Sequence, residues 1–284
     1  MLITEFHQLY KKKGLNQEVV KTFQSIIFSY FKQYGRDFPF RQDITPYNVL
    51  VSEMMLQQTQ TNRVSEKYQE FTKKFPDFMS LDNAPLNEIL ELWQGLGYNR
   101  RAVALKNIAQ RVIDEFNGIL PADVEILKSF PQIGHNTASS IVAFAFNLPT
   151  FFIEVNIRRV YIYFFFPGKN SINDKEVMPL VRTTLETSNV RKWYYALMDY
   201  GVMLKKSHPE LTKRSAHYRK QSKFKGSTRE LRGKILKLLI ERKLLTEVEI
   251  IKYLKSEPKK VRIILIQLAK EGFINLNKEG YFIP

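Results

Sequence analysis

Apolar side chains recur at helical spacing along residues 16–120, with only short breaks between one segment and the next. Such a period predicts amphipathic helices rather than strands. Helical segments are expected at 19–34, 47–64, 64–75, 85–94, 102–116, 123–129 and 137–146. The aromatic run 160–166 has the propensity of a strand, but its position between helices favours a buried helix. The body of the chain is therefore predicted to be all-α.

The composition limits the classes of binding partner and the kinds of metal or catalytic site that the chain can have. Lys and Arg number 44 against 28 Asp and Glu, and this excess of +16 favours a polyanion, most often nucleic acid. The sequence contains no cysteine, which excludes disulfides, thiolate zinc sites, iron–sulfur clusters and cysteine nucleophiles. The four histidines lie far apart, so we expect no metal site.

Targeting signals are not evident in the sequence. No apolar stretch approaches the length of a membrane span, and the first residues lack the charged-then-apolar order of a signal peptide. We therefore expect a cytoplasmic, nucleoid-associated protein with no membrane partner. We also expect it to act as a monomer.

Positive charge is concentrated after the body. Residues 205–237 carry twelve Lys and Arg and two acids, a net charge of +10. This composition predicts a body over residues 1–204, a basic linker over 205–225 and a separate module over 226–284. Ser227 is expected to cap the first helix of that module.

The module has the element order of a winged helix. Three helical segments, 228–242, 246–254 and 258–271, precede two strand-like stretches at 273–276 and 281–283. A winged helix would place three cations on its third, groove-facing helix, where they would contact the DNA backbone: Lys259, Lys260 and Arg262. The alternative is a small helical cap on the body, and winged helices also serve as protein-interaction modules.

The segment Phe130–Ala138 lies between two helical patterns. Gly134 is expected to supply a positive φ, and Thr137 to cap the helix that follows. Free N–H groups at such a helix start can hold a DNA phosphate without reading sequence, and Gln132 and His135 flank this position. The segment resembles the hairpin of helix-hairpin-helix DNA glycosylases, although taken alone an ordinary helix–turn–helix connection explains it equally well.

Four further blocks accompany the hairpin, at 52–60 (SEMMLQQTQ), 92–98 (LWQGLGY), 152–160 (FIEVNIRRV) and 196–201 (ALMDYG). In order and approximate spacing they resemble the blocks of MutY-type adenine DNA glycosylases, over roughly residues 34–204. A coincidence of this kind is improbable. The resemblance implies an all-α, two-lobed helix-hairpin-helix glycosylase fold that binds double-stranded DNA in the cleft between its lobes.

Two carboxylates are the candidate catalytic groups. Glu53 lies on a mostly apolar helical stretch, where a lone carboxylate costs free energy unless it is partnered or used. Burial would raise its pKa and let it act as a general acid. The resemblance implies that Glu53 protonates the departing base and that Glu154 stabilises the sugar cation. The alternatives are an outward-facing helix acid for Glu53 and a helix-start acid interacting with the backbone dipole for Glu154.

A glycosylase must take its target base out of the stack. The resemblance implies that Tyr98 is the aromatic wedge, that Gln58 fills the space near the flipped base, and that Leu56 belongs to the same wedge. The alternatives are a core aromatic for Tyr98 and an exposed polar residue for Gln58. The resemblance also implies a base pocket with three members: Arg41, Asn136 and Tyr195.

The sequence departs from the family pattern at several positions. Glu154 stands where the family usually has aspartate. Asn136 stands where the bifunctional branch has a Schiff-base lysine, so strand cleavage by that route is not expected. It also differs from the serine of adenine enzymes and the tyrosine of the thymine-mismatch branch. The stretch after Leu204, where relatives place four cluster cysteines, has none, so we expect no iron–sulfur cofactor.

The sequence therefore predicts a monofunctional DNA glycosylase of base excision repair. It would hydrolyse the N-glycosidic bond of a mispaired or damaged base, with adenine as the first expectation. Thymine or uracil opposite guanine is the alternative substrate. Two other hypotheses stay open, namely a non-catalytic binder of distorted DNA and a transcription regulator built around the winged helix.

Overall fold

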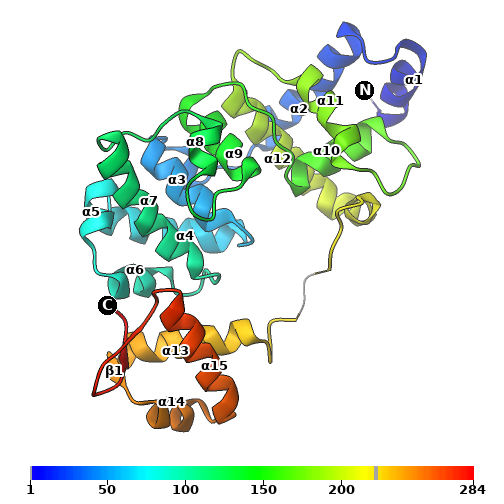
Figure 1. Ribbon diagram of the computed structural model, residues 1–284. Helices are drawn as coiled ribbons and strands as arrows, with labels where there is room; N and C mark the ends of the chain where they lie inside the picture. Colours follow the sequence, from blue (N-terminus) through cyan, green and yellow to red (C-terminus); the bar gives the residue numbers. More distant parts are fainter. Residues whose placement is uncertain (1, 221–222) are drawn as a thin grey trace. The chain divides into compact units, whose positions relative to one another are not determined.

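The computed structural model describes residues 2–220 and 223–284 (Figure 1). Over these residues the chain is mainly helical with one small sheet, which confirms the predicted fold class. The described residues form two compact units. Unit 1 comprises residues 2–49, 122–129 and 133–220, and unit 2 comprises residues 50–121, 130–132 and 223–284. The domain bounds expected at 204 and 225 stay a prediction.

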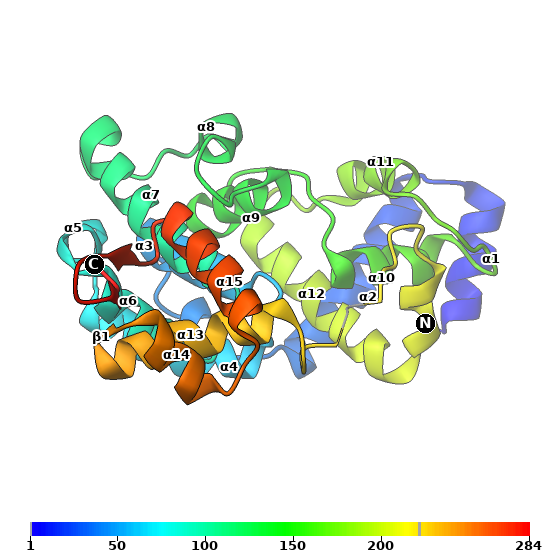
Figure 2. The ribbon, with the colours of Figure 1, turned by 60° about the horizontal axis from the view of Figure 1, so that its bottom comes forward.

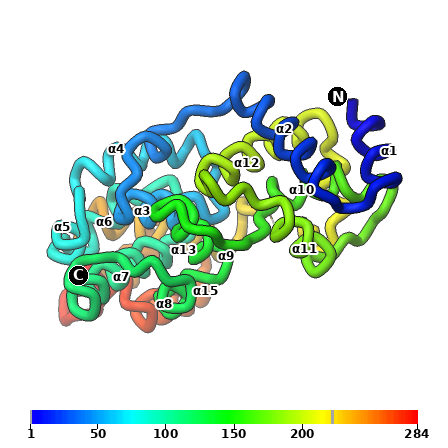
Figure 3. The backbone as a smooth tube through the Cα atoms, turned by 90° about the horizontal axis from the view of Figure 1, so that it is seen from above, coloured from blue at the N-terminus to red at the C-terminus, as the bar shows by residue number. Residues whose placement is uncertain are grey.

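Unit 1 is built around an aromatic core. Helices α2 and α10 both pack against α12 (Figure 3). The ring of Phe23 lies 5.0 to 5.7 Å, between centroids, from four other rings. The run 160–166 lies largely in α10, so the buried helix expected there is confirmed. The elements of unit 1 are α1 (Ile3–Lys13), α2 (Gln17–Tyr34), η1 (Pro39–Arg41), the start of α3 (Pro46–Leu56), α8 (Val124–Lys128), α9 (His135–Phe146), α10 (Val155–Phe165), α11 (Asp174–Thr184), α12 (Val190–Ser207) and η2 (Pro209–Arg214).

Unit 2 begins with the end of α3 and continues through four helices before the chain returns to unit 1. Helix α7 packs against α5 and α6, and Trp93 at the end of α6 is fully buried. These helices are α4 (Thr61–Lys74), α5 (Phe78–Asn83), α6 (Leu86–Trp93) and α7 (Arg100–Phe116).

The C-terminal module also belongs to unit 2, and its helix α13 packs against α6 (Figure 2). Its elements are α13 (Thr228–Arg242), β1 (Leu244–Leu245), α14 (Glu247–Leu254), α15 (Pro258–Lys270), β2 (Asn275–Leu276) and β3 (Tyr281–Phe282). Ser227 caps α13 as predicted. The strands form an antiparallel sheet in the order β1-β3-β2, with both Leu244 and Asn275 opposite Phe282. Strand β1 was not predicted, because two residues are too few to show an alternating pattern.

One predicted helix is wrong in its bounds. The segment expected at 47–64 is two helices, since α3 ends at Leu56 and α4 begins at Thr61. Gln58 between them has a left-handed φ of +56°, which no helix accommodates. The apolar period runs on across the break, so the sequence pattern did not reveal it. Four of the described α-helices, α1, α5, α11 and α12, lie outside the predicted segments. None of the described helices has both the length and the hydropathy of a membrane span.

Candidate active site and nucleic-acid interface

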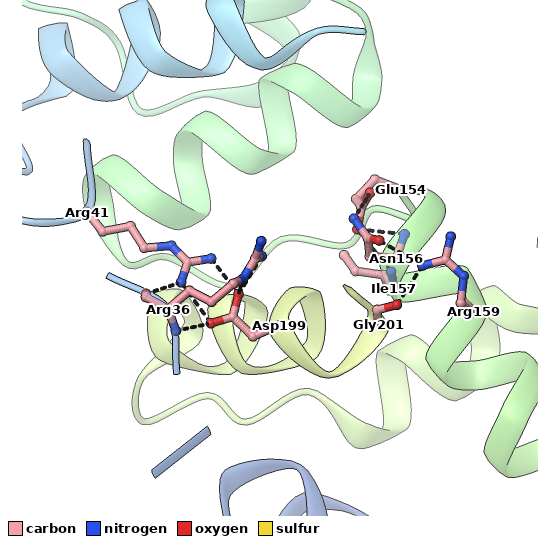
Figure 4. Close-up of polar contacts among 8 residues, drawn as sticks. All are labelled: Arg36, Arg41, Glu154, Asn156, Ile157, Arg159, Asp199 and Gly201. Carbon is pink, nitrogen blue, oxygen red and sulfur yellow. Dashed lines mark hydrogen bonds and ion pairs between the residues drawn. The ribbon is translucent and has the colours of Figure 1, made fainter. Parts of the chain in front are cut away.

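Glu154 is the N-cap of α10 (Figure 4). Its Oε1 accepts hydrogen bonds from the backbone N–H groups of Asn156 (2.9 Å) and Ile157 (3.0 Å), and its Oε2 accepts one from Asn156 Nδ2 (3.2 Å). Glu154 is half-buried, and burial raises the pKa of its carboxyl group. The two backbone N–H groups oppose this rise, as do the guanidinium groups of Arg159 and Arg158. These contacts fix the carboxyl group in one orientation at the helix start.

The first turn of α10 is held in place by Arg159, which is 2% exposed. Its Nη1 donates to Asn156 Oδ1 at 2.8 Å and to the Gly201 carbonyl oxygen at 2.6 Å, and its Nε donates to Thr212 Oγ1 at 3.1 Å. A Cβ atom on Gly201 would lie 2.4 Å from the Asn156 carbonyl oxygen. Only glycine therefore allows α12 to approach this turn, and Asn156 is clamped between Glu154 and Arg159.

The start of α9 holds the segment that leads into Glu154. Asn136 donates from Nδ2 to the Ile153 carbonyl oxygen at 2.9 Å, and His135 Nε2 lies 3.0 Å from the Phe151 carbonyl oxygen. The side chain of Asn136 thus supports the backbone directly before the candidate sugar-stabilising carboxylate.

The hairpin backbone differs from the expected one. Gly134 is the N-cap of α9 with a φ of −90°, so the expected positive φ at this glycine is wrong. Thr137 lies inside the first turn and is not the cap. The left-handed residue of the hairpin is Gln132, with a φ of +61°. Because Gly134 has no side chain to cap the helix, the start of α9 keeps the geometry of an anion site.

Two of the three expected base-pocket residues lie together in unit 1. The guanidinium carbon of Arg41 lies 4.3 Å from the centre of the Tyr195 ring, and that ring stacks on Phe144. Asp199 fixes Arg41 through two hydrogen bonds of 3.0 Å and also binds Arg36, with 2.6 Å between Arg36 Nη2 and Asp199 Oδ1 (Figure 4). The side chain of Asp199 is 1% exposed, so a buried carboxylate balances one of these two charges.

Glu53 lies on the part of α3 that belongs to unit 2. Ser52, Met54 and Met55 beside it are buried, whereas Glu53 is half-buried. Leu56, the last residue of α3, is half-buried as well. A carboxyl group in this setting is partly removed from water, as a general acid on an apolar helix requires.

Three candidate DNA-contacting residues of unit 2 share a left-handed backbone, which costs roughly 1–2 kcal/mol for a residue with a side chain. The φ angles are +56° at Gln58, +47° at Tyr98 and +61° at Gln132. The loops that carry Gln58 and Gln132 are joined, because Gln57 Nε2 donates to the Gln132 carbonyl oxygen at 3.1 Å. Strained backbone concentrates at functional sites. The trio therefore marks this end of unit 2 as the candidate interface.

Arg101 organises the same end of unit 2 and was not predicted from the sequence. It is 3% exposed, and burial lowers its pKa to about 10, so it stays charged at neutral pH. Its signal in the sequence is an arginine on the apolar face of α7, four and seven residues before the buried Leu105 and Ile108. The guanidinium donates to six carbonyl oxygens and one hydroxyl, namely those of Met54 (2.8 Å), Met55 (2.8 Å), Gln57 (2.6 Å), Leu96 (3.2 Å), Gly97 (2.8 Å), Tyr98 (3.4 Å) and the Thr59 side chain (3.1 Å).

Replacing Arg101 with methionine is expected to lower the free energy of unfolding by roughly 3 kcal/mol or more, because each buried carbonyl left without a donor costs about 1–3 kcal/mol. The melting temperature should fall by about 6–12 °C. Arg111→Met on the same helix is the control, since its ion pair with Glu115 lies at the surface. Equal melting temperatures for the two variants would contradict the structural role of Arg101.

A family described as HhH-GPD superfamily base excision DNA repair protein matches residues 51–186. The adenine DNA glycosylase of Buchnera aphidicola subsp. Baizongia pistaciae is 36% identical over 194 residues, which cover 66% of this chain and 54% of that protein. The adenine DNA glycosylase of Mus musculus is 37% identical over 150 residues, which cover 50% of this chain and 29% of that protein. The chain is similar to members of this superfamily over residues 51–186, slightly less than half of its length. It spans about half or less of the length of these curated relatives.

Solved structures agree with the superfamily fold. A thermostable thymine-DNA glycosylase is 26% identical, with a TM-score of 0.58, and the match covers 65% of this chain and 86% of that one. A trapped endonuclease III–DNA covalent intermediate gives a TM-score of 0.53 at 17% identity, covering 74% of this chain and 91% of that one, and shows the fold alone. The superfamily segment 51–186 includes the positions of Glu53, Tyr98 and Glu154.

Iron–sulfur clusters of superfamily members need thiolate ligands, which this sequence does not offer. The stretch after Leu204 instead forms η2 and is fixed by polar contacts. Arg214 donates from Nε to the Lys169 carbonyl oxygen at 2.8 Å, and the backbone N–H of Ile172 donates to the Arg214 carbonyl oxygen at 3.0 Å. Within the described part of the chain, no group of three or more His, Asp or Glu residues is placed to bind a metal. The residues present therefore do not fit a cluster.

The cations expected on the third helix of the module lie on α15, at its exposed surface. Lys260 pairs with Glu257 at 2.9 Å, and Arg262 pairs with Glu247 at 2.5 Å. Such exposed pairs are weak, so a DNA phosphate can compete for both cations. Helix α15 also exposes Ile263 and Ile266, and the protein-interaction alternative for the module therefore stays open.

Proposed function

We propose that the protein is a monofunctional DNA glycosylase that hydrolyses the bond between a mispaired base, adenine in the first place, and its deoxyribose. The observation that carries the proposal is the pair of carboxyl groups in the superfamily segment. Glu53 is half-buried on α3, and Glu154 is fixed at the start of α10. The curated relatives named adenine DNA glycosylase support adenine as the substrate.

In this proposal each carboxyl group has its own task. Glu53 gives its proton to the base as the C1′–N bond breaks and the bonding electrons leave with the base. The carboxylate of Glu154 stabilises the positive charge that develops on the sugar. Water then adds to C1′, and the Glu53 carboxylate takes up the proton that this water releases. The products are a free base and an intact strand with an abasic site.

DNA is the proposed partner, and several surfaces of the two units support it. Tyr98, Gln58 and Leu56 enter or border the space of the flipped base, and Arg41 with Tyr195 contributes to the base pocket. The uncapped start of α9 binds a phosphate, and a net charge of +16 attracts the duplex. The enzyme works without an iron–sulfur cluster in this proposal.

Thymine is the second candidate base, because the thymine-DNA glycosylase structure is the more similar of the two solved neighbours described above. A panel of duplexes, each with one mispaired or damaged base, separates the candidates. After incubation with the protein, heating in alkali reveals every abasic site as a strand break. Breaks only with adenine mispairs are expected, breaks only with thymine or uracil opposite guanine would shift the substrate, and no breaks at all would leave a non-catalytic binder.

The same panel tests how the sugar is released. Asn136 carries an amide, whose nitrogen is not nucleophilic, and it is bonded to the Ile153 carbonyl oxygen. We expect no strand cleavage before alkali and no covalent protein–DNA adduct after treatment with borohydride. A trapped adduct would show that another amine attacks C1′, and would overturn the monofunctional assignment.

A further inference from the structure

Within unit 2, the C-terminal module contacts the rest of the unit at the loop that carries Tyr98. Arg229, the second residue of α13, donates from Nη1 to the Tyr98 hydroxyl oxygen at 2.7 Å. The guanidinium carbon of Arg229 lies 5.7 Å from the centre of the Tyr98 ring, and that of Arg101 lies 5.6 Å from it. The module therefore supplies one of two arginines that contact the candidate wedge.

A second contact fixes the module at Arg100, two residues after Tyr98 in the chain. Glu271, at the end of α15, binds Arg100 with both carboxylate oxygens, at 2.8 and 2.7 Å. The same carboxylate binds Arg232 of α13 at 2.7 Å. The two guanidinium groups hold the pKa of Glu271 down to about 2, so the carboxylate stays charged in every buffer near neutrality. These two ion pairs of Glu271 keep α13, and with it Arg229, beside the start of α7.

We propose that Arg229 is a positioning residue, through which the C-terminal module holds Tyr98 in the orientation that enters the duplex. The inference rests on the wedge role of Tyr98 in the proposed function. Tyr98 has a strained left-handed backbone and is only half-buried, and two guanidinium groups, those of Arg229 and Arg101, contact its ring. A charge-assisted hydrogen bond to the hydroxyl at the far end of the ring sets its direction.

Base extrusion gives a direct readout of this role. The full-length Glu53→Gln protein is mixed with a duplex that carries 2-aminopurine beside the mispair, whose fluorescence rises when the stack opens. Adding Arg229→Met should reduce the rise and weaken binding to mispaired duplex about tenfold, as expected for one hydrogen bond to a charged group. Melting temperature and binding to matched duplex should stay unchanged. Arg242→Met removes the same charge from α13 at its contact with Tyr253, and should change neither signal.

A double-mutant cycle decides whether Arg229 acts through Tyr98. Tyr98→Phe removes the hydroxyl and keeps only the weaker contact between the guanidinium and the ring, so most of the effect of Arg229→Met should disappear in that background. Additive losses, a larger fluorescence rise in Arg229→Met, or equal behaviour of Arg229→Met and Arg242→Met would overturn the inference. If the Glu53→Gln parent gives no fluorescence rise and the wild-type protein excises no base, the proposed function fails. Excision by wild type with a normal Arg229→Met variant refutes only the positioning role.

Discussion

The Glu53→Gln protein is expected to bind mispaired duplex as wild type does, yet to excise the base about 10²–10⁴-fold more slowly. Glutamine has the shape of glutamate but no acidic proton to give to the departing base. Glu53 lies half-buried on α3 beside the buried Met54 and Met55, so the isosteric change leaves the packing intact. Single-turnover excision rates, measured with protein in excess over duplex, isolate the chemical step.

Glu66→Gln provides the matched control for this change. Glu66 lies exposed on α4, and its replacement removes the same charge without touching α3. The control should excise at the wild-type rate. A near-normal rate for Glu53→Gln would remove Glu53 from the mechanism, and a lowered melting temperature of that variant would assign it a structural role instead.

The sequence predicted most helices of the body because burial imposes a 3.6-residue period on apolar side chains. The buried aromatic segment of α10 was also predicted, since its place between helices outweighs the strand propensity of its rings. The break between α3 and α4 was not predicted, because it depends on the backbone of Gln58. Glutamine gives no local signal for a left-handed conformation. Strand β1 forms only by pairing with β3, which is a tertiary event.

The residues of the candidate site likewise divide into those that the sequence predicted and those that it did not. Glu53, Tyr98 and Glu154 stand in sequence blocks, so a single chain was enough to name them. Arg101 was not named, and Asp199 appeared only as part of the block 196–201 with no role of its own, because the importance of both comes from groups that meet only in the fold. Arg101 gathers carbonyl oxygens from two separate loops, and Asp199 joins η1 to α12. The one local sign in the sequence of a residue that binds several segments in this way is a charge on an apolar helix face.

Glu154→Gln is the second substitution expected to have a large effect, with a loss of about 10²–10³-fold in excision rate. The amide oxygen of glutamine can still accept the N–H groups of Asn156 and Ile157, so the cap on α10 persists. What disappears is the negative charge that the proposed mechanism places near the developing sugar cation. Excision rate and melting temperature, measured together, separate the lost charge from a lost cap. A variant with wild-type activity would make the carboxylate structural.

The pH dependence of the wild-type protein gives an independent check on Glu154. Burial raises the pKa of its carboxyl group, and the role proposed for it needs the ionised form. Activity that depends on this form is present above the raised pKa and is lost as pH falls through it. The acid limb of the excision rate should therefore begin above the ordinary glutamate value of about 4.3. In Glu154→Gln this limb should be absent.

The Glu154→Asp variant tests whether the site has adapted to the longer side chain of glutamate. Aspartate is a favoured N-cap, so the helix start and the melting temperature should survive the change. The carboxylate, however, is withdrawn by about one bond length, and misplacement by about 1 Å can cost up to 10²-fold in rate. Asn156 cannot follow it, because Arg159 and Gly201 clamp that residue from the other side. We therefore expect aspartate to be slower than glutamate but faster than glutamine. An aspartate variant as fast as wild type would show that the clamp does not set the carboxylate's position.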